Sequence, residues 1–218
     1  VDSNKIDVVR NGVDVSRYQP MKQCIKLASK YNIKNNFVVG YIGTHGMAHG
    51  LSNVLKVAEK LKYDKNIIFL FVGAGADREN LIKLSSDRNL PNTLFLPMQP
   101  KEEMQSIWSL CDIALVHLKN NPAFSEVIPS KIFEAMSMGL PILLNMPDGE
   151  ARDIIEKEFA GIWVPPENPE ALSKSIKILI EDKKLHKTIS QNCIAAAPKY
   201  SRSHQAQKMI DVFDKAIL

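Results

Sequence analysis

Short apolar runs alternate with longer amphipathic stretches over most of the chain. The runs at 37–43, 66–73, 93–96, 112–118, 141–145 and 161–165 are rich in aliphatic and aromatic residues and predict buried strands. Glycine or proline closes several of these runs, and helical spacing follows, as over 51–61. This alternation predicts an α/β fold with a doubly wound, mostly parallel sheet that binds its ligand at the carboxyl ends of the strands.

Further helices are expected at 77–89, 101–110, 131–138, 149–157, 171–181, 183–197 and 202–218. In the helix expected at 51–61, one apolar face is made by Leu51, Val54, Leu55, Ala58 and Leu61. Asn168-Pro169-Glu170 is a strong helix start, because asparagine caps, proline presets the first turn and glutamate favours the dipole. The first twenty residues differ, with a short strand expected at 6–10 and a turn at Asn11-Gly12.

Composition narrows the class of protein. The 218 residues are 45% hydrophobic and 24% charged, which suits one large domain with a full core. The net charge of +4 is mild and its basic residues are scattered, so we expect no nucleic-acid partner. Cys24, Cys111 and Cys193 are far apart and predict reduced thiols rather than a disulfide or zinc site. With no long apolar run, we expect a cytoplasmic location.

The stretch from Glu126 to Pro141 carries the most chemistry. It places Glu126 on a loop and Glu134 in the first turns of a helix that Ser130 can cap. A helix N-terminus favours phosphate, whereas carboxylates repel it and bind hydroxyl groups instead. A ligand with both features is a nucleotide sugar. The alternative is that each glutamate is an ordinary solvated charge.

Two glycine-rich turns follow predicted strands, at 43–50 and at 73–75. Glycine permits tight turns and lets backbone N–H groups approach a phosphate. His45 and His49 are four residues apart, a spacing that metal ligands can use on a helix. We expect no metal, because the neighbouring glycines predict a turn and no third ligand is evident.

The pattern Glu-x7-Glu followed by Ala-Met-x-x-Gly-x-Pro resembles the signature of family-4 glycosyltransferases of the GT-B fold. The resemblance implies that the chain is the Rossmann-like, donor-binding C-terminal half of such an enzyme, with an acceptor-binding domain normally preceding it. It divides the chain into a linker-like segment with a first strand (1–20), a nucleotide-sugar-binding domain (21–200) and a C-terminal helix that crosses back towards the first domain (201–218).

The same resemblance implies a role for each matching residue. Glu126 would bind hydroxyls of the transferred sugar, and Glu134 would bind the ribose. Thr44 and His49 stand where the family commonly has arginine and lysine, so Lys131 is the candidate for the diphosphate charge. The remaining residues expected at the substrate are Gly43, His45, Gly73, Met98, Gln99, Val127, Ile128 and Ser130. For Met98, a place in the core is an equal alternative, and for Lys131 an exposed surface position is.

The implied reaction transfers a sugar, expected to be UDP-linked, to a lipid-linked or polysaccharide acceptor in bacterial surface glycan synthesis. The family mostly retains anomeric configuration and needs neither metal nor cofactor. The Pro-Ser-Lys sequence at 129–131 resembles a branch that transfers amino sugars in O-antigen and capsule assembly. The full enzyme would work at the inner membrane face, and this half alone would bind donor without transfer. Two alternatives stay open, a sugar-nucleotide epimerase of GT-B fold and a non-catalytic nucleotide-binding module.

Overall fold

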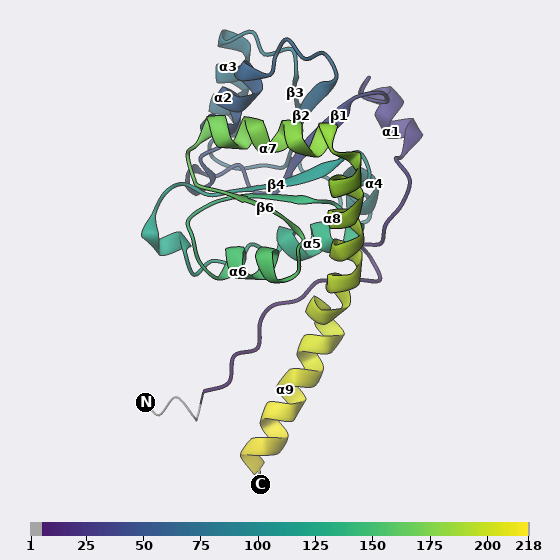
Figure 1. Ribbon diagram of the computed structural model, residues 1–218, viewed down its shortest axis with the longest axis vertical. Helices are drawn as coiled ribbons and strands as arrows, with labels where there is room; N and C mark the ends of the chain where they lie inside the picture. The colour runs from purple at the N-terminus through teal and green to yellow at the C-terminus, as the bar shows by residue number, and fades with distance from the viewer. Residues whose placement is uncertain (1–5, 218) are drawn as a thin grey trace.

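A six-stranded, wholly parallel sheet forms the centre of the computed structural model, which describes residues 6–217 (Figure 1). Its strands are β1 (Phe37–Ile42), β2 (Ile67–Val72), β3 (Thr93–Leu96), β4 (Ile113–His117), β5 (Ile142–Asn145) and β6 (Gly161–Val164). Their order in the sheet is β3-β2-β1-β4-β5-β6, so the chain winds outwards in both directions from β1 and β4. The predicted doubly wound sheet is therefore confirmed.

Helices cover both faces of this sheet. In Figure 1, α7 lies above the strands while α5 and α6 lie below them. The α-helices are α1 (Ile25–Lys30), α2 (Ser52–Lys60), α3 (Arg78–Asp87), α4 (Met104–Trp108), α5 (Lys131–Met138), α6 (Glu150–Lys157), α7 (Pro169–Glu181), α8 (Lys183–Ala196) and α9 (Arg202–Ile217). The 3-10 helices are η2 (Met47–His49), η3 (Pro122–Phe124) and η4 (Ala197–Tyr200). None of the helices within 6–217 has the length and apolar character needed to span a membrane.

Local sequence signals explain where several helices begin and which face they bury. All five residues of the apolar face expected around α2 are buried against the core. The side chain of Asn168 accepts a hydrogen bond from the amide of Ala171 at 3.0 Å, which confirms the predicted cap of α7. The helix expected at 101–110 is shorter, because 101–103 form a turn and α4 begins at Met104.

The strand predicted at 6–10 is wrong. Those residues form no strand, and Ile6 and Val8 are exposed, because within residues 6–217 no other strand lies beside them to pair with. The segment attaches later, where the amide of Val13 donates to the carbonyl of Tyr200 and the Val13 carbonyl accepts from Arg202, both at 2.9 Å. Residues 1–5 of the predicted linker lie outside the described part of the chain.

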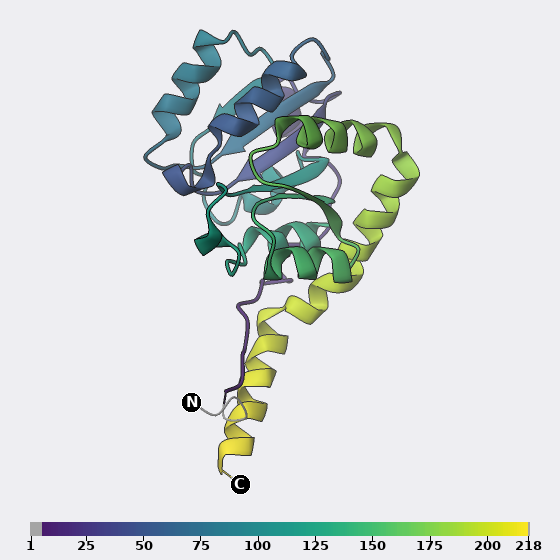
Figure 2. The ribbon, with the colours of Figure 1, turned by 60° about the vertical axis from the view of Figure 1, so that its left-hand side comes forward.

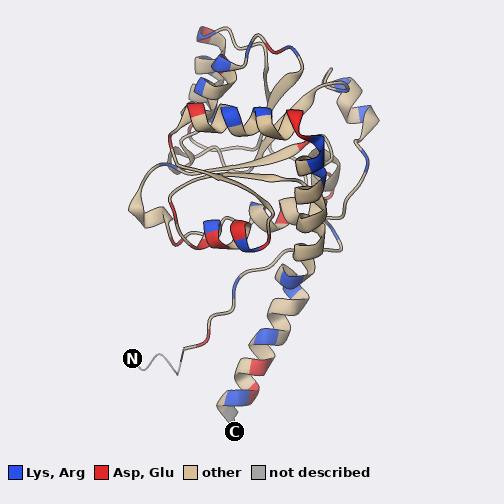
Figure 3. Cartoon of the chain, in the orientation of Figure 1, with Lys and Arg blue, Asp and Glu red and all other residues tan. Residues whose placement is uncertain are grey.

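The last helix, α9, projects from the body on the side from which the N-terminal segment also leaves (Figures 1 and 2). Its apolar residues Met209, Ile210 and Phe213 are exposed. Lys and Arg are spread over many elements, as Figure 3 shows, in agreement with their scattered positions in the sequence.

Candidate functional site

Two adjoining pockets lie at the carboxyl ends of the strands, where β1 and β4 diverge in the winding order. A parallel sheet binds its ligands at such a switch point. The larger pocket has a volume of about 390 Å³ and the smaller about 180 Å³. They share Ile42, Gly43, Thr44 and Met104, so together they form one cleft.

The larger pocket brings together most of the residues expected at a substrate. Besides the four shared residues, its lining is Tyr18, His49, Leu118, Val127, Pro129, Ser130, Lys131 and Glu134. The smaller pocket adds Val72, Gly73, Ala74, Met98 and Gln99. Met98 is 74% exposed, which argues against the alternative that it is a core methionine. The side chain of Gln99 turns back and donates to the carbonyl of Pro97 at 2.8 Å.

The two glycine turns pack directly against each other at the floor of the cleft. Gly43 and Gly73 have φ angles of +142° and +148°, which favour glycine, and a Cβ atom on Gly73 would overlap the Gly43 carbonyl. The amides of Gly43 and His45 donate to Val72 and Ala74 carbonyls at 2.9 and 2.8 Å. Among the described residues, only the Thr44 amide of this 43–45 turn has no partner. The expectation that the whole turn offers amides to phosphate is therefore corrected.

His45 lies behind the cleft rather than in it. Its ring is fully buried among aromatic side chains, with ring centroids 5.8 Å from Tyr41, 6.3 Å from Phe71 and 6.5 Å from Phe95. Burial, followed by the nearby Arg78, lowers the pKa of His45 to about 4 and keeps the ring neutral. The ring supports the turn from below and lines neither pocket of the cleft, so His45 lies apart from the residues expected to bind substrate with it.

Lys131 carries the unusual charge of the site. Its ammonium nitrogen is buried and lies beside Gly43, 3.8 Å from the centroid of the Tyr41 ring. This nitrogen has no hydrogen-bond partner among the described residues. Burial lowers the pKa of Lys131 to about 7, and nearby Glu134 opposes that shift. The alternative of an exposed surface lysine is excluded. A buried, unpaired cation at a pocket wall is suited to an anionic ligand.

His49 does not replace the missing family lysine as a cation. Its ring lines the larger pocket, 6.0 Å from the Tyr41 ring, and its pKa is lowered by burial and then by Lys131. The carbonyl of His49 is held at 2.6 Å by the Nδ1 atom of the buried His117. Burial also lowers the pKa of His117, to about 4, so both rings are neutral near pH 7.

The loop before α5 departs from the expected geometry in three ways. Ser130 stands at the N-cap position, but its hydroxyl makes no capping hydrogen bond. The Val127 amide donates to the carbonyl of Phe124 at 3.2 Å, so it is already used. The Ile128 side chain packs against the core and lines neither pocket, while its amide has no partner among the described residues and stays a candidate for the diphosphate. Glu126 is exposed and lines neither pocket, which separates it from Glu134.

Glu134 is a partly buried residue of the pocket wall rather than a fully solvated charge. One carboxylate oxygen accepts a hydrogen bond from the indole Nε1 of Trp108 at 3.3 Å. Burial raises the pKa of Glu134, while Trp108 and then Lys131 lower it. The second oxygen has no hydrogen-bond partner in the described part of the chain, so it is available to a ligand that offers hydroxyl groups.

Tyr18 is a residue of the cleft that the sequence did not reveal, because its neighbours have the composition of a linker. Its carbonyl accepts a hydrogen bond from the hydroxyl of Ser137 on α5, which fixes the segment beside Glu134. Burial raises the pKa of Tyr18, and the Glu134 charge raises it further. Tyr18 is the one aromatic residue in the mostly polar range from Asn11 to Pro20, and this is the one signal that points to it in retrospect.

The chain is similar in sequence to known proteins over most of its length. The family model described as "Glycosyl transferases group 1" matches residues 25–195. WcaI of Escherichia coli K12 is 30% identical over 145 residues, which cover 66% of this chain and 35% of WcaI. The UDP-Gal:alpha-D-GlcNAc-diphosphoundecaprenol alpha-1,3-galactosyltransferase of Escherichia coli is 28% identical over 202 residues, or 88% of this chain and 49% of that enzyme. The chain thus spans half or less of the length of these relatives.

Solved structures show the same fold. The crystal structure of Anabaena Alr3699/HepE in complex with UDP is similar with a TM-score of 0.84 over 96% of this chain and 57% of HepE, at 21% identity. The similarity identifies the architecture as that of the C-terminal half of a GT-B fold.

Proposed function

The chain belongs to the group 1 glycosyl transferases, and we propose that it is the donor-binding half of an enzyme that transfers a sugar from a nucleoside diphosphate sugar. The observation that carries this proposal is the pairing of Lys131 and Glu134 on one helical turn. The first offers a buried, unpartnered ammonium to an anion, and the second offers a carboxylate oxygen to hydroxyl groups. A nucleoside diphosphate presents both kinds of group.

The two pockets suit the parts of such a donor. In this assignment the base lies in the smaller pocket between Gly73 and Met98, and the ribose hydroxyls reach Glu134. The diphosphate lies between them, against Lys131 and the free amide of Thr44. Glu126, on the exposed loop next to the cleft wall, is assigned to the hydroxyls of the transferred sugar.

The chemical role of the site is to stabilise the leaving group. Negative charge grows on the diphosphate as the bond to the sugar breaks, and a fixed cation in a water-poor pocket stabilises that charge strongly. Binding of the diphosphate would also raise the pKa of Lys131 and keep it protonated. No group in this assignment requires a metal or cofactor.

We further propose that the donor is UDP-linked and that the acceptor is a lipid-linked or polysaccharide glycan of the bacterial surface. The UDP in the HepE complex and the UDP-sugar in the name of the Escherichia coli galactosyltransferase support the base. The diphosphoundecaprenol in that name supports a lipid-linked acceptor. Retention of configuration, an amino sugar as the transferred group and work at the inner membrane face belong to the same proposal.

Calorimetric titration of the 218-residue chain with UDP, GDP and ADP tests the donor site. We expect UDP to bind best, and Glu134→Ala to weaken its binding by about 1–3 kcal/mol through loss of the ribose hydrogen bonds. Glu79→Ala is the matched control, because Glu79 also lies in a first helical turn but its side chain is 88% exposed. Equal affinity for all three nucleotides, or equal effects of the two substitutions, would contradict the proposal.

A second titration separates transfer from the alternatives. We expect the chain to bind UDP-sugar without releasing UDP, because the acceptor-binding half is needed for turnover. An epimerase would instead convert the donor sugar without any acceptor, and a nucleotide sensor would bind UDP and UDP-sugar equally. Either result would overturn the assignment.

A further inference from the structure

A third pocket lies at the opposite edge of the sheet, at the amino ends of β2 and β3. Its volume is about 550 Å³, within the range of small-molecule sites. It is lined by Ile67 and Ile68 at the start of β2, by Lys62, Tyr63 and Lys65 on the turn before that strand, and by Asn89, Pro91 and Asn92 before β3. The donor cleft is at the far end of β2, about 20 Å away at 3.3 Å per residue.

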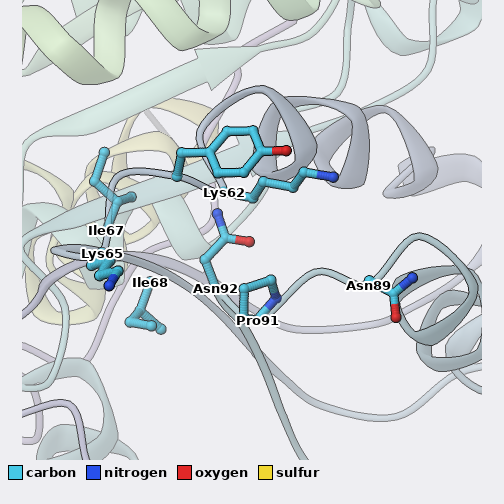
Figure 4. A pocket seen from close by; sticks show the side chains of 8 residues that line it. Lys62, Lys65, Ile67, Ile68, Asn89, Pro91 and Asn92 are labelled. Carbon is cyan, nitrogen blue, oxygen red and sulfur yellow. The ribbon is translucent and has the colours of Figure 1, made fainter.

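Asn92 gives this pocket a fixed polar group. Its side-chain Nδ2 donates to the carbonyl of Ala58 at 2.8 Å, and its backbone carbonyl accepts from the amide of Phe69 at 2.8 Å. The first bond fixes the side chain and the second fixes the backbone of the same residue. The remaining side-chain oxygen, Oδ1, is buried and has no hydrogen-bond partner among the described residues. Figure 4 shows the amide between Lys62 and Pro91. A buried acceptor of this kind favours a ligand that donates a hydrogen bond, such as a hydroxyl.

The pocket lining also contains an aromatic ring and two lysines. Tyr63 is 86% exposed and presents an aromatic face. Lys62 and Lys65 bring two positive charges, and no acidic residue lines the pocket. The nearest acid in sequence, Asp64, accepts from the amide of Asn66 at 3.2 Å. Ile67, Ile68 and Pro91 supply an apolar wall for the C–H face of a ring.

We propose that this pocket binds an acidic saccharide unit, separately from the donor site. A sugar hydroxyl donates to Asn92 Oδ1, the C–H face of the ring packs on Tyr63 and the apolar wall, and the carboxylate pairs with Lys62 or Lys65. A fatty acid would leave Asn92 Oδ1 unpaired, and a neutral sugar would not use the lysines. The site holds a glycan without taking part in transfer.

The test is an NMR titration of the 218-residue chain with two probes, a hyaluronan tetrasaccharide, which contains glucuronate, and the neutral chitotetraose. We expect saturable shifts of the Asn92 and Tyr63 signals with the acidic probe, and affinity at least about fivefold weaker for the neutral one. Lys62→Ala and Tyr63→Ala should each weaken the acidic probe about tenfold. UDP affinity should not change in either variant.

Lys30→Ala is the matched control, because Lys30 lies over the Tyr31 ring at 5.2 Å much as Lys62 lies over Tyr63 at 5.4 Å, but outside any of these pockets. Equal weakening by Lys30→Ala and Lys62→Ala would show nonspecific attraction and overturn the proposal. The proposal would also be overturned if the signals that shift with the acidic probe lay away from Asn92. It would fail as well if benzoate, a simple aromatic carboxylate added as a third probe, bound while neither tetrasaccharide did. These outcomes do not depend on the donor site, which UDP binding tests separately.

Discussion

The pockets at the two edges of the sheet differ in how far their polar and charged side chains are exposed to solvent. At the carboxyl edge, the charged groups of the cleft are shielded from solvent before any ligand arrives, because the Lys131 ammonium is buried and Glu134 is partly buried. At the amino edge, Tyr63 and Lys65 stand in solvent. Burying an unpaired charge destabilises the fold, whereas an exposed one has little effect. Substitutions at the carboxyl edge should therefore change stability and affinity together, and those at the amino edge affinity alone.

The largest effect should come from the backbone contact beneath the donor cleft. Gly73→Ala places a Cβ against the Gly43 carbonyl at a φ of +148°, so the two turns must separate. We expect a loss of about 3 kcal/mol or more in the free energy of unfolding. UDP binding should fall with it. Urea denaturation followed by circular dichroism measures the change.

Gly46→Ala in the same turn is the control for this substitution. A Cβ there would meet its nearest atoms, on His49 and Thr44, at 3.5 Å, an ordinary contact distance. The φ of Gly46 is −100°, which any residue adopts. We expect a change below about 1 kcal/mol. If the two substitutions destabilised equally, the close approach of the turns would not be what stabilises this edge.

Lys131→Met tests the buried charge directly. Methionine keeps the length of the side chain while removing the ammonium, so UDP affinity should fall about 10- to 100-fold. The free energy of unfolding at pH 6 should instead rise by about 1–3 kcal/mol, because an unpaired buried charge is lost. Lys62→Met at the amino edge should change it by less than about 0.5 kcal/mol. Stability that falls in Lys131→Met would contradict the comparison.

The stability difference between Lys131→Met and the wild-type chain should depend on pH. Below pH 7, Lys131 is charged in both the folded and the unfolded chain, so the folded state bears the whole penalty of burial. Between the folded pKa of about 7 and the ordinary value of 10.5, the unfolded chain binds the additional proton, so wild-type stability rises with pH. The advantage of Lys131→Met should therefore shrink from pH 7 to pH 10. A constant difference across that range would show that Lys131 does not titrate as described.

Features that depend on local sequence could be predicted well. The helix expected at 131–138 is found with those bounds, because Gly139 adopts the left-handed conformation, with φ of +71°, that ends it. The order of strands and helices follows from alternating apolar runs. The strand at 6–10 failed because pairing depends on a distant partner, which a single segment does not reveal.

The site was harder to predict than the fold, for the same reason. Spacing placed Lys131 and Glu134 near one helix start, but the direction of the Lys131 ammonium depends on Tyr41, ninety positions earlier. The sequence predicted His45 at the substrate, but in the fold three aromatic rings surround its side chain, and they come from strands that its local sequence does not reveal. Tyr18 could not be found, since only the fold brings the linker to α5.

Tyr18→Phe is expected to have an intermediate effect. It removes one hydroxyl from the wall beside Glu134, where the donor ribose is assigned, so UDP affinity should fall about three- to tenfold. Tyr63→Phe at the amino edge keeps the ring and should leave UDP binding unchanged. Calorimetry with both variants separates the edges. Unchanged affinity in Tyr18→Phe would make this residue a structural part of the linker only.

The smallest effect should come from Met98, which resembles an amino-edge residue in its exposure although it lies in the donor cleft. Because the side chain is 74% exposed in the free chain, Met98→Ala should change the free energy of unfolding by less than about 0.5 kcal/mol. UDP binding would bury the side chain against the base, so affinity should fall by about threefold. Ribose 5-phosphate, which lacks the base, should bind both forms equally. A similar loss of affinity for both ligands would place Met98 away from the base. A large fall in the free energy of unfolding would show that exposure does not decide which residues at this edge stabilise the fold.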